Sequence, residues 1–144
     1  AGAVFQNVTV GGTLSVSAAA VFSGSILSSS SSGGIGYATG AGGSVTQTIS
    51  KSAGVTLNTI VGQIAMHNAA LAANAEVQFL VTNSTVSTID LIVINHSSTG
   101  TYGAYFVQAR AGTGGMTISV RNLSAGSLSE AIILSFAVIQ GVSS

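Results

Sequence analysis

The sequence predicts an all-β protein with a β-sandwich or jelly-roll-like body and an extended β N-terminal arm. Three observations support this fold class. Apolar and polar residues alternate over short runs, as they do along strands that bury one face. Eight such runs recur at a spacing of roughly 8–12 residues, which is typical of sandwiches and jelly rolls. Turns rich in glycine, serine and asparagine separate the runs.

The arm and its linker cover residues 1–34, and the body covers residues 35–144. The arm contains alternating pieces at roughly six-residue spacing, which are too short for strands with a core of their own. We expect these pieces to stack on themselves or to pair with other chains, or else to form an ordinary strand pair on the body. Serines and two glycines then make a flexible linker. The apolar side chains of the arm that we expect to contact partner chains are Val4, Phe5, Val8, Val10, Leu14, Val16, Val21 and Phe22.

The expected strands of the body alternate between an apolar and a polar face. In the fourth strand Val77, Phe79 and Val81 share one face, and polar residues occupy most of the other. The seventh strand repeats this pattern, with Met116, Ile118 and Val120 on one face and Thr117, Ser119 and Arg121 on the other. The eight strands are expected at residues 44–50, 54–58, 63–67, 75–83, 88–96, 104–111, 116–122 and 131–140.

Two of these segments are apolar on both faces. Residues 88–96 and 131–140 are therefore expected to be central strands, or strands that a neighbouring subunit covers. One segment competes with the all-β interpretation, because residues 68–75 are rich in alanine and could form a single helical turn.

Charge is almost absent, since only 4% of the residues are charged where roughly 25% is usual. A nucleic-acid partner is not expected, because such proteins need a cluster of Lys and Arg. The six charged residues would leave about 1,100 Å² of surface each, and an interface needs roughly 800 Å² per partner. We therefore expect a homo-oligomer or a lattice component. The alternative is a monomer that hydroxyl and amide groups keep soluble.

The sheet edges support the same expectation. Monomeric β proteins usually protect their edges with Lys, Pro or inward-pointing charges, and this chain has one Lys and no Pro. Pairing between subunits would protect the edges, although short strands and glycine bulges could do so within a monomer. No apolar stretch reaches the ~18–20 residues of a membrane-spanning helix, and no signal peptide is apparent, so we expect synthesis in the cytoplasm and no membrane partner.

The residues that could carry catalysis or bind a metal are few. His67 and His96 end candidate strands, where a polar side chain ordinarily reaches solvent. Asp90 and His96 lie on one strand roughly 20 Å apart, which argues against a triad formed locally with a serine. There is no cysteine, no phosphate-binding loop and no metal-ligand spacing. We therefore expect no enzyme activity, no cofactor and no metal.

Several segments of the body also resemble a known protein module. Residues 36–47, 50–58, 62–64, 81–84, 121–130 and 136–139 together look like a module found in structural proteins of tailed bacteriophages. The module covers about three quarters of the chain, and the arm is similar to the repetitive β segments of phage fibre shafts. The resemblance implies a non-enzymatic virion protein, and it brings no set of binding residues with it.

The small size of the chain favours a capsid decoration (cement) protein that binds the major capsid protein at the capsid surface. Its attachment would depend little on salt, because few charges take part. The fibre-like arm favours a trimer over a dimer, although two-fold pairing of sheet edges remains open. The alternative is a tail-fibre or spike tip for host recognition, and a self-assembling fibre or matrix protein is a third class. In the tip, loops would bind glycans and the candidate contacts are Tyr37, Tyr102 and Tyr105.

Overall fold

A computed structural model describes residues 8–142 of the chain. The chain divides into two parts, residues 1–35 and residues 36–144. Within the described part of the first, residues 8–35, there is no strand or helix and every residue is exposed. A local turn orders the linker, because Ser30 Oγ accepts hydrogen bonds from the backbone N–H groups of Ser32 and Gly33. The predicted strand pair is therefore absent from residues 8–35, and pairing of the arm with other chains stays a prediction.

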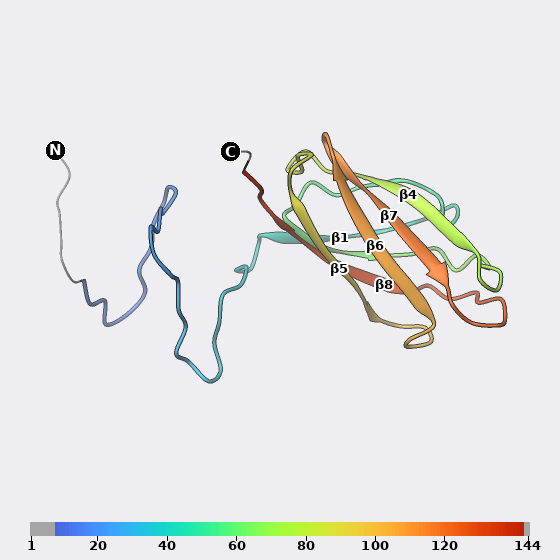
Figure 1. Ribbon diagram of the computed structural model, residues 1–144, viewed down its shortest axis with the longest axis horizontal. Helices are drawn as coiled ribbons and strands as arrows, with labels where there is room; N and C mark the ends of the chain where they lie inside the picture. Colours follow the sequence, from blue (N-terminus) through green and yellow to red (C-terminus); the bar gives the residue numbers. More distant parts are fainter. Residues whose placement is uncertain (1–7, 143–144) are drawn as a thin grey trace. The chain divides into compact units, whose positions relative to one another are not determined.

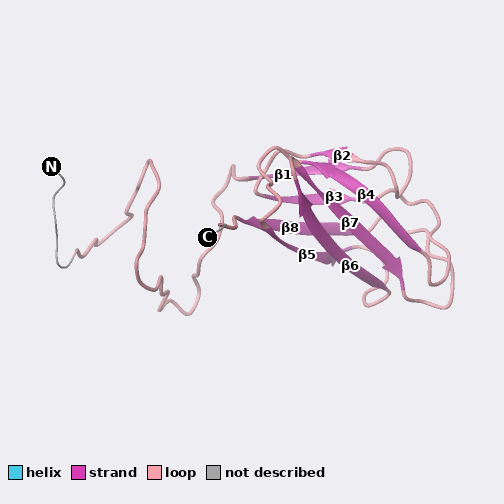
Figure 2. Ribbon diagram, turned by 45° about the horizontal axis from the view of Figure 1, so that its top comes forward, coloured by secondary structure: helices cyan, strands magenta, loops and turns pink. Residues whose placement is uncertain are grey.

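Residues 36–142 fold into strands and loops without a helix, which confirms the all-β prediction (Figures 1 and 2). All eight expected strands are present, with ends that differ from the expected ones by a few residues. Their bounds are β1 Gly42–Thr46, β2 Val55–Thr56, β3 Val61–Ala65, β4 Glu76–Thr82, β5 Leu91–Ser98, β6 Tyr105–Gly112, β7 Gly115–Asn122 and β8 Ile133–Ile139.

The strands form two four-stranded sheets in a sandwich-like arrangement. Sheet A has the order β1-β3-β8-β5, and sheet B has the order β2-β4-β7-β6. Each sheet is mixed, because β1 pairs with β3 and β2 pairs with β4 in parallel while the other pairs are antiparallel. Figure 2 shows both sheets of the body. The jelly-roll connectivity stays a prediction.

The core lies between the inner faces of the two sheets. Sheet B contributes Phe79 and Val81 from β4 and Ile118 and Val120 from β7, all of them buried. Sheet A contributes the even-numbered residues of β3 and β8, among them Phe136. Burying these side chains is the main stabilising contribution that such a sandwich has. The alternation predicted for the fourth and seventh strands is confirmed.

The two segments that are apolar on both faces have different positions. β8 is central as predicted, between β3 and β5. β5 is instead an edge strand of sheet A, so the prediction of a central strand is wrong there, and cover by a neighbouring subunit stays a prediction. Its outward side chains Leu91 and Val93 remain more than half exposed, while Ile92 and Ile94 pack on the core. β5 lies alongside β6, the edge of the other sheet.

The helical turn that was the alternative for residues 68–75 is also absent. The segment is irregular, and Leu71 forms an isolated antiparallel bridge with Leu128. Asn122, at the end of β7, holds it in place because its buried amide nitrogen donates to the carbonyl oxygens of Leu71, Ala72 and Gly126. An alanine-rich sequence without caps has only a weak preference for helix, and these tertiary hydrogen bonds override it.

Candidate functional site

The predicted contacts of the arm are available to a partner where they are described. The structure leaves these side chains largely exposed and without strand pairing, and Val4 and Phe5 lie outside the described residues. The exposed members are Val8, Val10, Leu14, Val16, Val21 and Phe22.

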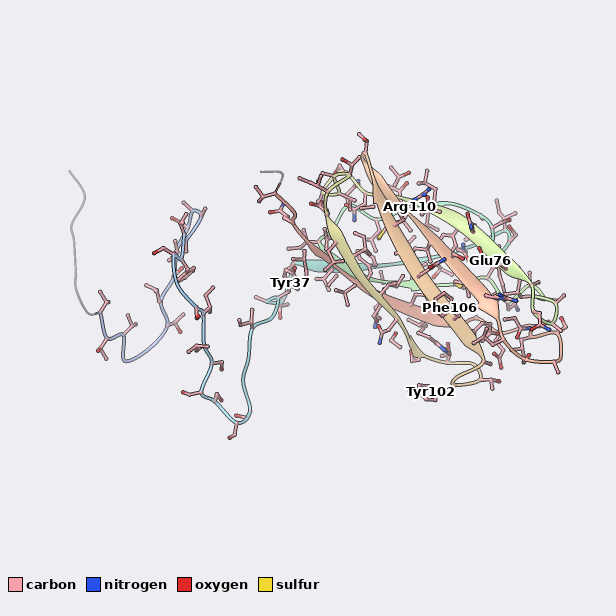
Figure 3. The ribbon with its side chains drawn as sticks, in the orientation of Figure 1. Tyr37, Glu76, Tyr102, Phe106 and Arg110 are labelled. Carbon is pink, nitrogen blue, oxygen red and sulfur yellow. The ribbon has the colours of Figure 1, made fainter. Side chains whose placement is uncertain are left out.

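The three tyrosines predicted as loop contacts have different environments, and Figure 3 labels two of them, Tyr37 and Tyr102. Tyr102 lies on the loop between β5 and β6 and is 94% exposed. Tyr37 is partly exposed, and its hydroxyl donates a hydrogen bond to the carbonyl oxygen of Val138 at 2.9 Å. Tyr105 is buried, so its prediction as a loop contact is wrong. It begins β6 with the same parity as the inward-facing Val107, which is why its ring packs into the core.

Tyr105 belongs to a cluster at the end of the sandwich where β5 turns into β6. Its hydroxyl donates to Glu130 Oε2 at 2.8 Å, and its ring meets the ring of His96 edge-on. Burial, followed by the hydrogen bond to Glu130, raises the pKa of Tyr105. Thr101 donates to the same carboxylate through its hydroxyl and its backbone N–H. These bonds lower the pKa of Glu130, with the Thr101 hydroxyl contributing most.

The remaining candidate chemical groups also serve the fold. Each carboxylate oxygen of Asp90 accepts a hydrogen bond from a backbone N–H group, one from Ser87 and the other from Gly141. These bonds lower the pKa of Asp90 and connect the turn before β5 to the segment after β8. Lys51 donates to the backbone carbonyls of His67 and Glu130, and burial lowers its pKa. Among residues 8–142 no group of three His, Cys, Asp or Glu side chains could hold a metal ion.

The outer face of sheet A carries an apolar patch, which we define as Leu91, Val93, Ile139, Val61 and Ala137. Leu91 pairs with Ile139 across the ladder, and Val61, Ala137 and Val93 form the next row. Leu91, Val93 and Ile139 are each more than half exposed. No outward position on β3, β5 or β8 carries a charged side chain. An uncharged apolar surface of this kind is typical of an interaction site.

The outer face of sheet B carries polar residues in register on three strands. Ser119 of β7 pairs with Gln78 of β4 on one side and with Gln108 of β6 on the other. In the neighbouring row Thr117 lies between Leu80 and Arg110. A hollow of about 350 Å³ is lined here by Gln78, Gln108, Ala109, Arg110, Thr117 and Ser119.

A third row on the same face pairs Arg121 with Glu76 and Phe106. Glu76, Phe106 and Arg110 project from sheet B in Figure 3. Gln78 Nε2 donates to Glu76 Oε1 at 2.8 Å, and this bond is the main cause of the lowered pKa of Glu76. The Ser119 hydroxyl lies near enough to that carboxylate to lower its pKa further, although the two do not form a hydrogen bond of good geometry.

The sequence predictions did not identify the residues around this hollow as a site. The alternation in the fourth and seventh strands did place Gln78 and Ser119 on outward faces. What the alternation could not supply was the order β4-β7-β6, which brings Gln78, Ser119 and Gln108 into one row. Glutamine at outward positions of two strands is the signal that could have indicated this face.

Residues 8–142 contain no helix that could span a membrane. Comparison with protein-family models, with curated proteins and with solved structures found no match to this chain.

Proposed function

We propose that this chain is a non-enzymatic bacteriophage virion protein, a capsid decoration protein that binds the outer shell and stabilises it. The observation that carries the proposal is the uncharged apolar patch on sheet A, together with the exposed apolar side chains of the arm. Burial of such side chains against a partner is favourable by roughly 25 cal/mol per Å² of apolar area. The resemblance to phage structural proteins supports the identity of that partner as the major capsid protein.

A structural role also agrees with how the rare polar groups are used. The carboxylates of Asp90 and Glu130 accept hydrogen bonds from backbone and hydroxyl groups, and the Lys51 ammonium donates to two carbonyls. These contacts hold loops together at the two ends of the sandwich. Because these charged groups already bind parts of the protein itself, few of them are left to act on a substrate.

In the proposed mechanism the apolar patch of sheet A packs on the shell, and the arm pairs with a neighbouring copy, most simply in a trimer. Binding to the assembled shell and not to its dissociated subunits shifts the equilibrium toward the shell by mass action. Linked copies on one lattice also gain avidity. Because the patch is uncharged, attachment should depend little on ionic strength.

The test is co-sedimentation of the purified full chain with capsid shells that lack it, at salt concentrations from about 0.05 M to about 1 M. We expect saturable pelleting at a fixed stoichiometry that changes little with salt. Loss of binding at high salt would contradict the apolar mechanism, and no pelleting at any salt would overturn the decoration role.

A fibre or spike tip for host recognition is the alternative function. The nearly complete exposure of Tyr102, at the tip of the loop between β5 and β6, favours it. An exposed ring at a loop tip is suited to stacking on a ligand. A chain that fails to pellet with shells but binds host cells, and loses that binding in Tyr102→Ala, would support the alternative.

A further inference from the structure

The hollow on the outer face of sheet B contains a buried polar atom that forms no hydrogen bond within residues 8–142. Ser119 is 5% exposed, and its Oγ forms no hydrogen bond of good geometry among the described residues, although the Glu76 carboxylate lies near it. Buried hydroxyls in proteins are nearly always paired, so an unpaired one at the floor of a hollow needs an explanation. A ligand group that enters the hollow and hydrogen-bonds to Ser119 would supply it.

The surrounding side chains define what kind of ligand fits. Each glutamine offers an amide donor and a carbonyl acceptor, and Thr117 and Ser119 offer hydroxyls that both donate and accept. Because Gln78 Nε2 already donates to Glu76, the Gln78 carbonyl oxygen is left to accept a bond from a ligand. Mixed donors and acceptors at this density match hydroxyl groups, which also do both.

Two more residues beside the hollow help to define the ligand. Phe106 lies one outward position from Gln108 along β6 and is half exposed, so an apolar ring face is available beside the polar row. Arg110 lies one outward position from Gln108 on the other side and adds five N–H donors. A simple anion would use Arg110 but would face the glutamine carbonyl oxygens without a donor to offer them.

From this geometry we infer that the outer face of sheet B binds a carbohydrate. A sugar ring presents hydroxyls to Gln78, Gln108 and Ser119, and its C–H face packs on Phe106. The source is a cell-surface polysaccharide or a free oligosaccharide, which share this chemistry. The inference goes beyond the proposed shell attachment, because the outer faces of the two sheets point away from each other. A copy that docks through sheet A therefore leaves sheet B open to the medium.

The first measurement is binding of the labelled full chain to an array of purified bacterial polysaccharides and of short neutral and acidic oligosaccharides. A ¹⁵N-labelled sample is then titrated with the best oligosaccharide, and separately with sodium sulfate. We expect saturable shifts of backbone amides on β4, β6 and β7, at affinities on the order of millimolar for a single site. Binding to polysaccharides but not to their short fragments, with shifts on the same strands, would identify the extended polymer as the source.

Two variants and one control make the result specific. Gln108→Ala should weaken sugar binding about tenfold, because it removes a donor and an acceptor from the row. Ser119→Ala should weaken it by a smaller factor and should leave the melting temperature unchanged or higher, because it removes an unpaired buried hydroxyl. Gln63→Ala is the matched control, since Gln63 is an exposed glutamine on the outer face of sheet A.

Three results would overturn the inference. The first is the absence of saturable binding to any saccharide. The second is binding that Gln108→Ala leaves unchanged. The third is sulfate causing the same shifts as the sugar, which would make the hollow an anion site around Arg110. None of these results bears on shell attachment, which the co-sedimentation experiment tests separately.

Discussion

The outer faces of the two sheets differ in chemistry although one core supports both. The outward positions of sheet B carry Glu76, Arg110 and Arg121, which are three of the six charged residues in the chain. The outward positions of β3, β5 and β8 in sheet A carry none. Because outward residues do not pack in the core, the fold leaves their chemistry free to vary. The difference therefore points to two surfaces with separate partners.

Both sheets depend on one core, and the largest expected effect comes from disrupting the contacts that support it. Asn122→Ala removes the buried amide that donates to Leu71, Ala72 and Gly126 and leaves their carbonyls without this donor. We expect it to lower the free energy of unfolding by about 3 kcal/mol, measured by urea denaturation. Asn95→Ala is the control on the outer face of sheet A and should change stability by less than about 0.5 kcal/mol. Equal effects of the two substitutions would contradict the assigned role of Asn122.

A charge placed on each face in turn should separate the two surfaces. Leu91 on sheet A and Leu80 on sheet B are 60% and 54% exposed, so they form a matched pair. Leu91→Asp should weaken shell binding at least about tenfold, because it buries an unpaired carboxylate in the interface. Leu80→Asp should weaken it less than about twofold. Equal losses in the co-sedimentation assay would show that shell attachment does not distinguish the faces.

The smallest expected effect is a loss of stability at acid pH. It involves two carboxylates, one on the outer face of sheet B and one at the end of the sandwich. Hydrogen bonds hold the pKa of Glu76 and of Glu130 below the ordinary value of 4.5. Groups with a lowered folded pKa contribute stability above the ordinary value, and that contribution is lost as the pH falls through the folded pKa. Stability should therefore be level near neutral pH and should fall below about pH 4.5.

Variants at the two carboxylates should differ in this acid sensitivity. Glu130 accepts three hydrogen bonds from Thr101 and Tyr105, whereas Glu76 accepts one from Gln78. Glu130→Gln should therefore reduce the stability difference between about pH 7 and about pH 3 more than Glu76→Gln does. Thermal melts at the two pH values measure this difference. The reverse order would mean that the face of sheet B, and not the cluster around Tyr105, dominates the acid response.

Alternation along the chain was enough to locate every strand of the body but not to pair them. Phe79 and Ile118 were placed on inward faces because a period of two is a local property. The position of β5 at an edge depends on pairing with β8, about forty residues away, which no local pattern records. The row of Gln78, Ser119 and Gln108 was missed for the same reason. Tyr105 could have been predicted as buried, because it shares its parity with Val107 and Ala109.

The central position of β8 has a consequence for how the chain is made. β3 and β5 both pair with β8, so sheet A lacks its middle strand until residues 133–139 have left the ribosome. Translation proceeds at about 5–20 residues per second, and during that time β5 has no partner strand in sheet A and β3 can pair only with β1. Unpaired strand edges recruit other chains. Sheet A therefore cannot be completed before β8 emerges, and a chain that stops before Ile133 should aggregate instead of folding in part.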